Sequence, residues 1–273
     1  GVDRSYEFPA NKLGYENLTY TDSQQVGNMA LGGFEKGVTT EEMAAAYAAF
    51  VNEGVYTKPR TFVRVEDANG NVILENEAQS TVAMKNTTAA IINHLLQEAA
   101  LNGTGYEAQF SGMHIAGKTG STNSNKDRYF VGYTPYYSCA VWAGYEHNQR
   151  IVASGNPCSA IFRKVMSAIH EELPDKDFFS CAGLTSVAVC ADSGMLASEN
   201  CALDVRGSRV YTALVAADNA PTSVCTMHTA PSYTVNMADS DGNVTYPTAA
   251  GGADQGERSV GHDEMMLEDG FTM

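Results

Sequence analysis

The stretch "HIAGKTGSTNSNKDRYFVGYTP", from His114 to Pro135, decides how this chain folds. It places Lys118 among small residues, passes through a polar turn, and ends in a run rich in Tyr, Phe and Val. β-Branched and aromatic residues in short runs favour strands, and clusters of Ser, Asn and Asp favour turns. Together with the next run, "SCAVWAGYE", the stretch predicts an antiparallel meander of three strands.

Helical patterns lie on both sides of this meander in the sequence. In "GVTTEEMAAAYAAFVNEG", Thr39 and Glu42 have the spacing of a capping box, and Gly54 is a stop. "NTTAAIINHLLQEAALNGTG" predicts a helix with a Thr or Asn cap that stops at Gly103, and "NPCSAIFRKVMSAIHEELP" predicts one that ends at Pro174. Helices on both sides of an antiparallel sheet indicate an α+β domain.

Apolar residues at helical spacing predict which faces these helices bury. The residues expected to be buried are, helix by helix, Met43, Tyr47, Phe50 and Val51; Ile91, Leu95 and Ala99; and Ile161, Val165, Met166 and Ile169. Between the first two helices, "TFVRVEDANGNVILE" predicts a peripheral β-hairpin, because Asn69-Gly70 readily supplies the positive φ angles of a tight turn.

Composition and charge exclude several classes of protein. A chain of 273 residues, 44% of them hydrophobic, can bury one good core and a small satellite domain. The net charge of −15 argues against a nucleic-acid partner, because phosphate binding needs clustered Lys and Arg, and the chain has 17 in all. No apolar stretch has membrane-spanning length, and no signal peptide is recognisable. Residues 229–273 are acidic and poor in apolar residues, which predicts a disordered tail.

A succession of motifs resembles one enzyme family. "ALGG", "GVTTEEMAAAYAAFVNEGVY", "NGTG", "AGKTGST", "DRYFVGYTP" and "AVWAGYE" follow one another as in the transpeptidase domain of bifunctional, class A penicillin-binding proteins. The resemblance covers residues 25–178 and continues more weakly through "VCADSGMLASENC" and "CTMH". It implies the serine D,D-peptidase fold shared with β-lactamases, with residues 1–178 as part of the transpeptidase domain, 179–228 as a small Cys-containing module and 229–273 as the tail.

The resemblance also implies an activity, which is peptidoglycan cross-linking through the motifs S-x-x-K, S-x-N and K-T-G. The substrates would be peptidoglycan stem peptides, β-lactams would be covalent inhibitors, and no cofactor would be needed. The location would be the extracytoplasmic face of a bacterial cell membrane.

The K-T-G stretch itself suits an anionic, peptide-like ligand. Lys118 supplies a cation, neighbouring hydroxyls supply donors, and Gly120 lets a substrate main chain lie against the strand. Transferred by position from the family, Lys118 would organise proton transfer, and the Thr119 and Ser121 hydroxyls would hold the terminal carboxylate. Gly120 and Thr122 would line the same binding site. The backbone N–H of Ser121 would be one of two oxyanion donors.

The sequence departs from the family pattern at the nucleophile. No S-x-x-K occurs in the 273 residues, and S-x-N occurs only at or after the K-T-G motif, at Ser121, Ser154 and Ser198. We therefore expect a C-terminal fragment, inactive alone, whose acylated serine, S-x-N motif, glycosyltransferase domain and membrane helix lie upstream of Gly1.

Two other functions remain open. A serine β-lactamase-like hydrolase shares K-T-G, but it would normally end soon after the helix that follows the sheet, and "YFVGYTP" argues against it. A non-catalytic cell-wall binding module would be consistent with the missing nucleophile.

The cysteines leave a choice between a disulfide and a metal site. No C-x-x-C pair occurs, and Cys190, Cys201, Cys225 and His228 permit either a disulfide with a spare thiol or a three-cysteine, one-histidine zinc site. The extracytoplasmic setting implied by the resemblance allows disulfides, and the spacings are irregular for a zinc fold. We therefore expect a disulfide between Cys201 and Cys225 and no metal.

Overall fold

The computed structural model describes residues 2–229 and forms two compact units. Of the described residues, the first unit contains those up to 187 together with 212–220, and the second contains 188–211 and 221–229. The domain limits expected from the sequence stay predictions. All but the first residue of the expected disordered tail lies outside the described residues.

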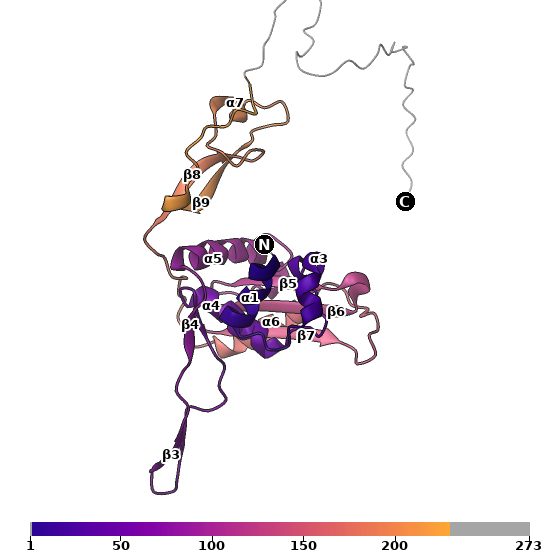
Figure 1. The fold of residues 1–273 in the computed structure, drawn as a ribbon, viewed down its shortest axis with the longest axis vertical. Helices are drawn as coiled ribbons and strands as arrows, with labels where there is room; N and C mark the ends of the chain where they lie inside the picture. Colours follow the sequence, from indigo (N-terminus) through magenta and orange to yellow (C-terminus); the bar gives the residue numbers. More distant parts are fainter. Residues whose placement is uncertain (1, 230–273) are drawn as a thin grey trace, which may run out of the picture. The chain divides into compact units, whose positions relative to one another are not determined.

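A three-stranded antiparallel sheet lies at the centre of the first unit (Figure 1). Its strands are β5 (Ala116–Ser121), β6 (Asp127–Tyr133) and β7 (Ser138–Gly144), in that order. The meander predicted from the sequence is therefore confirmed. Because β5 is an outer strand, its second edge pairs with no other strand of the described chain.

Three helices pack against this sheet. α4 (Thr40–Val51) contacts β6 and β7, α5 (Asn86–Leu101) contacts β5, and α6 (Pro157–Ile169) contacts β6 and β7. The predicted α+β class is confirmed. None of the helices in the described part of the chain is long and apolar enough to cross a bilayer.

The remaining elements lie outside the three-stranded sheet and its three helices. In the first unit they are α1 (Val2–Leu13), α2 (Tyr20–Gln24), α3 (Val26–Ala30), the paired strands β1 (Val55–Thr57) and β4 (Ser80–Val82), the paired strands β2 (Arg64–Glu66) and β3 (Val72–Glu75), and the 3₁₀ turns η1 (Tyr106–Ala108), η2 (Asn123–Asn125) and η3 (Ala217–Asn219). β8 (Leu184–Cys190) pairs with β9 (Val210–Ala216), and each has residues in both units. The second unit also contains α7 (Glu199–Ala202).

The helix starts confirm one predicted cap and correct another. At α4 the Glu42 N–H donates to Thr39 Oγ1 at 3.1 Å and the Thr39 N–H donates to Glu42 Oε2 at 2.8 Å, which is the predicted capping box. At α5 the cap is Lys85, and no side chain caps the helix. The predicted Thr or Asn cap was wrong because Asn86 is already the first helical residue.

The buried faces of the helices differ from those predicted. In α6, the predicted burial of Met166 is confirmed, and Phe162 is buried beside it. The other predicted residues, Ile161, Val165 and Ile169, are about half exposed. In α5, Leu95 is 60% exposed, and the buried positions are Ala89, Ala90, Asn93 and Ala100. In α4 the buried positions are Ala46 and Ala49. The row of Phe162 and Met166 and the row of Ile161, Val165 and Ile169 are both apolar. The first row is the buried one because the Phe162 ring packs against the Phe130 ring, with 4.7 Å between the ring centroids.

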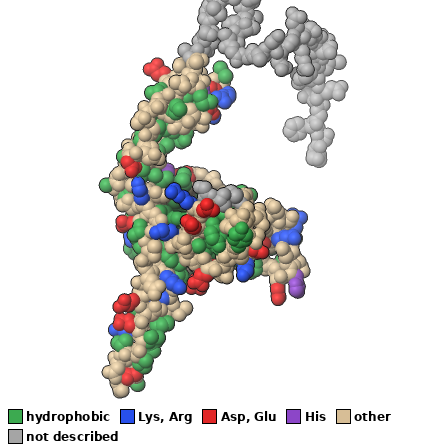
Figure 2. Space-filling view, viewed as in Figure 1, with side chains coloured by type: hydrophobic (Ala, Val, Ile, Leu, Met, Phe, Trp, Pro, Cys, Tyr) green, Lys and Arg blue, Asp and Glu red, His purple; other side chains and the backbone are tan. Residues whose placement is uncertain are grey.

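The predicted hairpin is formed by β2 and β3, with Gly70 at φ +84°. Its apolar side chains are exposed along both strands, as Figure 2 shows at the lower end of the view; they are Val65, Val72, Ile73 and Leu74.

A buried polar contact joins α4 and α5 to the sheet. The Tyr133 hydroxyl donates to Asn93 Oδ1, and the Asn93 amide donates to the Phe50 carbonyl at 2.9 Å. Tyr133 is fully buried and Asn93 is 2% exposed. Burial raises the pKa of the Tyr133 phenol, so this side chain stays a neutral donor. One hydrogen-bonded pair therefore joins α5 to β6 and to the end of α4.

Close packing of glycines brings β5 against β6. Gly117 lies opposite Gly132, and the Phe130 ring lies over this pair. A Cβ at Gly117 would stand 2.7 Å from Phe130 Cζ and 2.8 Å from the Val131 carbonyl oxygen. Glycine inside a strand often marks such a close approach. The position of β5 therefore depends on the absence of a side chain at Gly117.

Tyr133→Phe should destabilise the protein by about 1–3 kcal/mol, because it leaves the buried Asn93 oxygen without its donor. The measurement is the denaturant midpoint, with Tyr106→Phe as the control because Tyr106 is 67% exposed. Equal midpoints for the two variants would contradict the account.

Gly117→Ala should also cost about 1–3 kcal/mol, because the new methyl group meets backbone as well as a packed ring. Gly27→Ala, where a Cβ would meet no atom within 4 Å, is the matched control and should unfold at or above the wild-type midpoint. Tolerance of the Gly117 variant would show that β5 can move away from β6.

Candidate active site

The sequence-predicted site lies on the outer strand β5. Lys118 is exposed, and its ammonium donates to the Thr119 carbonyl at 3.2 Å and lies 3.5 Å from Thr119 Oγ1. The cation and the first hydroxyl of the motif therefore lie side by side. Both are available to a ligand at this edge of the sheet.

Thr119 and Ser121 share one face of β5, because side chains alternate along a strand. Thr119 Oγ1 lies 2.7 Å from Thr104 Oγ1, and Ser121 Oγ accepts a hydrogen bond from Arg128 Nη1 at 3.2 Å. Arg128 is directly opposite Ser121 in the β5–β6 register. On this face the Thr119 hydroxyl therefore has the Thr104 hydroxyl as its neighbour, and the Ser121 hydroxyl has the Arg128 guanidinium.

Thr122 and Asp127 hold the turn that joins β5 to β6. Thr122 Oγ1 donates to Asp127 Oδ2 at 3.1 Å and accepts from the Asp127 N–H at 2.8 Å. Trp142 Nε1 donates to the other carboxylate oxygen of Asp127 at 3.1 Å. These contacts occupy the Thr122 hydroxyl within the turn. Its role in substrate binding stays a prediction.

Gly120 has a structural role as well as the predicted one. A Cβ at this position would lie 3.0 Å from the Cβ of Tyr129, which is its partner across the β5–β6 register. The absence of a side chain at Gly120 therefore relieves crowding with the neighbouring strand, and its role in substrate binding stays a prediction.

The residue that caps the start of α6 is hydrogen-bonded to β6, the middle strand of the sheet. The Asn156 amide donates to the Tyr129 carbonyl at 2.9 Å, and its Oδ1 accepts from the Cys158 N–H at 3.0 Å. Glu107 Oε2 accepts from the Asn156 N–H at 2.9 Å. A single capping residue thus links α6, β6 and the turn η1.

Thr104 and Asn156 were not singled out by the sequence analysis, and Arg128 was given no role there. "NGTG" after a helix and "NP" before one were visible in the sequence, but the partners of these residues depend on the strand register and on tertiary packing.

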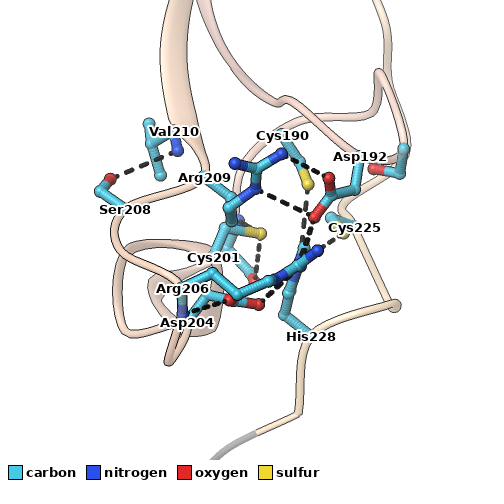
Figure 3. A network of polar contacts seen from close by, with 12 residues as sticks. Cys190, Asp192, Cys201, Asp204, Arg206, Ser208, Arg209, Val210, Cys225 and His228 are labelled. Atoms are coloured by element: carbon cyan, nitrogen blue, oxygen red, sulfur yellow. Dashed lines mark hydrogen bonds and ion pairs between the residues drawn. The ribbon is translucent and has the colours of Figure 1, made fainter.

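A second group of reactive side chains lies in the second unit (Figure 3). One ligand atom from each of Cys190, Cys201, Cys225 and His228 lies within 4.8 Å of the other three. Cys201 and Cys225, the predicted disulfide partners, are free thiols in the structure. A hydrogen bond from Arg209 lowers the pKa of the nearby Asp192 to about 2, assisted by Arg206, although desolvation opposes this shift.

Comparison with protein families gives two matches. The model described as penicillin binding protein transpeptidase domain matches residues 1–167. The model described as penicillin-binding protein 1A, C-terminal domain, matches residues 180–230.

The curated relatives are considerably longer proteins. Penicillin-binding protein 1A of Clostridium perfringens (strain ATCC 13124) is 35% identical over 252 residues, which cover 89% of this chain and 30% of the relative. Penicillin-binding protein 1A of Clostridium novyi is 37% identical over 219 residues, which cover 79% of this chain and 25% of the relative. The chain therefore spans less than a third of the length of these relatives.

A solved structure supports the fold. The crystal structure of penicillin-binding protein 1A from Haemophilus influenzae aligns with a TM-score of 0.65 at 19% identity, covering 82% of this chain and 38% of that one. The predicted serine D,D-peptidase and β-lactamase-like fold is thereby confirmed. The family matches, the clostridial relatives and this fold together show that the chain belongs to the penicillin-binding protein transpeptidase family.

Proposed function

We propose that the chain is the part of a peptidoglycan cross-linking D,D-transpeptidase that binds the substrate's terminal carboxylate. The observation that carries the proposal is the outer strand β5, which presents the Lys118 ammonium beside the hydroxyl of Thr119 and an open backbone edge. A strand edge pairs with an extended peptide, and a cation beside hydroxyl donors suits a carboxylate.

The substrate we propose is the D-alanyl-D-alanine end of a stem peptide. Its carboxylate accepts hydrogen bonds from the Thr119 and Ser121 hydroxyls, and the Arg128 guanidinium, already bonded to Ser121, adds positive charge. If Thr104 donates its proton to Thr119 Oγ1, the Thr119 proton is left free for the carboxylate. Thr104 then acts as a positioning residue.

In the proposed reaction a serine attacks the carbonyl between the two D-alanines, and the Ser121 N–H stabilises the oxyanion that forms. Lys118 helps to organise the accompanying proton transfer. D-Alanine leaves, an acyl-enzyme remains, and the amino group of a second stem peptide takes the acyl chain. A β-lactam enters as a mimic of the donor and stays attached.

The nucleophile of this reaction is proposed to come from residues outside the printed sequence, because S-x-x-K does not occur in it. We further propose that those residues include a glycosyltransferase domain and a membrane helix that holds the site on the extracytoplasmic face. The upstream coding sequence separates the alternatives. An in-frame S-x-x-K and S-x-N support the transpeptidase, whereas a start codon at this point supports a non-catalytic cell-wall module.

Lys118→Ala, in a chain extended to include the acylated serine, should slow labelling by a fluorescent penicillin at least tenfold. A charge-assisted hydrogen bond is worth about 1.5–3 kcal/mol, and about 1.4 kcal/mol corresponds to a factor of ten. Lys126→Ala removes a nearby charge outside the motif and should leave the rate unchanged. A full labelling rate for Lys118→Ala would refute the proposed role of Lys118. Labelling of the 273-residue chain alone would refute the proposal that the nucleophile lies outside it.

Thr104→Val should slow the same acylation by about threefold to tenfold, since one neutral hydrogen bond contributes about 0.5–1.5 kcal/mol. Thr104→Ser restores the hydroxyl and should recover most of the rate. A Thr104→Ser variant as slow as Thr104→Val would mean that the methyl group, and not the hydroxyl, matters.

A further inference from the structure

The Cys and His cluster of the second unit is built from three separate segments. Cys190 ends β8, Cys201 lies in α7, and Cys225 and His228 follow β9 in the chain. The three cysteines are buried, and the His228 side chain is 8% exposed. The cysteines also form the only buried cluster within the described part of this unit, with Ala197 and Val210 packed against it. So small an apolar core gives little stability by itself, and small modules commonly depend on disulfides or a metal.

We propose that Cys190, Cys201, Cys225 and His228 bind one Zn²⁺ ion as a tetrahedral structural site. Zn–S bonds of about 2.3 Å and Zn–N bonds of about 2.0 Å place neighbouring S and N ligands about 3.5 Å apart in a tetrahedron. His228 Nδ1 lies 3.5 Å from Cys190 Sγ and 3.5 Å from Cys225 Sγ. The four ligand atoms are mutually within 4.8 Å, so the chain brings all four groups together and already sets two of the S–N distances that one ion requires.

The surroundings of His228 orient it for this role (Figure 3). Its Nε2 lies 3.0 Å from Asp192 Oδ2 and 3.1 Å from Asp204 Oδ2. A carboxylate on Nε2 keeps the ring proton there, so Nδ1 presents its lone pair to the sulfur atoms. This is the arrangement in which metal-binding histidines are usually held by a second partner.

The two carboxylates are themselves held in place. Arg209 Nη2 donates to Asp192 Oδ1 at 2.7 Å, Arg206 Nη2 donates to Asp192 Oδ2 at 2.7 Å, and Arg206 Nε donates to Asp204 Oδ1 at 2.8 Å. Because these oxygens already accept from guanidinium groups, the acids are poor ligands for a cation and suit an orienting role. The metal therefore belongs on the sulfur side of His228, although Asp192, Asp204 and His228 also lie close together.

The same geometry favours a metal over the Cys201–Cys225 disulfide expected in the sequence analysis. A disulfide would bond only two of the sulfurs and would not involve Cys190 or His228, whereas one ion would bind all four groups. Cys201 Sγ also accepts from the Ser198 N–H at 3.4 Å and lies 3.2 Å from Ser198 Oγ, so hydrogen-bond partners already hold this sulfur in position. Three thiolates and one imidazole are a donor set for Zn²⁺. Its binding releases the thiol protons to solvent and transfers no electrons.

The test uses the 273-residue chain, purified with a reductant, freed of metal by a chelator, and then supplied with Zn²⁺ alone. We expect one tightly held zinc ion per chain by elemental analysis after desalting. Co²⁺ in place of Zn²⁺ should give the visible absorption of tetrahedral cobalt with sulfur ligands. This readout depends neither on a variant nor on the proposed transpeptidase activity.

Variants locate the ion. Cys201→Ser, Cys225→Ser and His228→Gln should each lose the stoichiometric zinc, whereas Cys181→Ser, which removes a thiol outside the cluster, should retain it. Asp192→Asn keeps all four ligands but weakens the acceptor that orients His228, so zinc affinity should fall about tenfold to a hundredfold.

Any of three results would overturn the proposal. The first is a reduced wild-type chain that takes up no Zn²⁺. The second is that the three ligand variants and Cys181→Ser bind equal amounts of zinc. The third is peptide mapping that finds Cys201 joined to Cys225 in protein isolated from zinc-supplied cells.

Discussion

The close approach of β5 to β6 is the constraint on which the candidate active site depends. Gly117 and Gly132 face each other across the two strands, and Phe130 lies over them and against Phe162 of α6. The same pairing puts Arg128 opposite Ser121 and leaves the second edge of β5 without a strand partner in the described chain. The hydroxyls and the open edge that we assign to substrate binding thus follow from packing at the other end of the strand.

Sequence reasoning predicted the elements better than their contacts. The meander, the Thr39–Glu42 capping box and the Asn69-Gly70 hairpin depend on residues close together in the chain, and all three are present in the structure. The buried row of α6 was mispredicted because two apolar rows compete, and Phe130, distant in sequence, decides between them. Lys118 was located through the family resemblance. Thr104 was missed because only the folded chain brings it to Thr119.

The second unit shows the same limit more sharply. Spacing along the chain left a disulfide and a metal site both open, and the extracytoplasmic setting implied by the family resemblance, together with the irregular intervals, favoured the disulfide. The convergence of three sulfurs and one imidazole nitrogen is a tertiary property, as is the placement of Asp192 and Asp204 on the far side of the imidazole. If the zinc proposal is correct, the module gains through one ion the stability that its small core does not supply.

We propose that the outer edge of β5 receives the carboxylate and the acyl group of the substrate. A crystal structure of the penicillin adduct, formed by a chain extended to include the acylated serine, would show both groups in place. We expect the carboxylate to accept hydrogen bonds from the Thr119 and Ser121 hydroxyls, and the acyl carbonyl oxygen to accept from the Ser121 N–H. An adduct whose carboxylate and carbonyl lie away from β5, with Lys118, Thr119 and Ser121 in contact only with water, would contradict it.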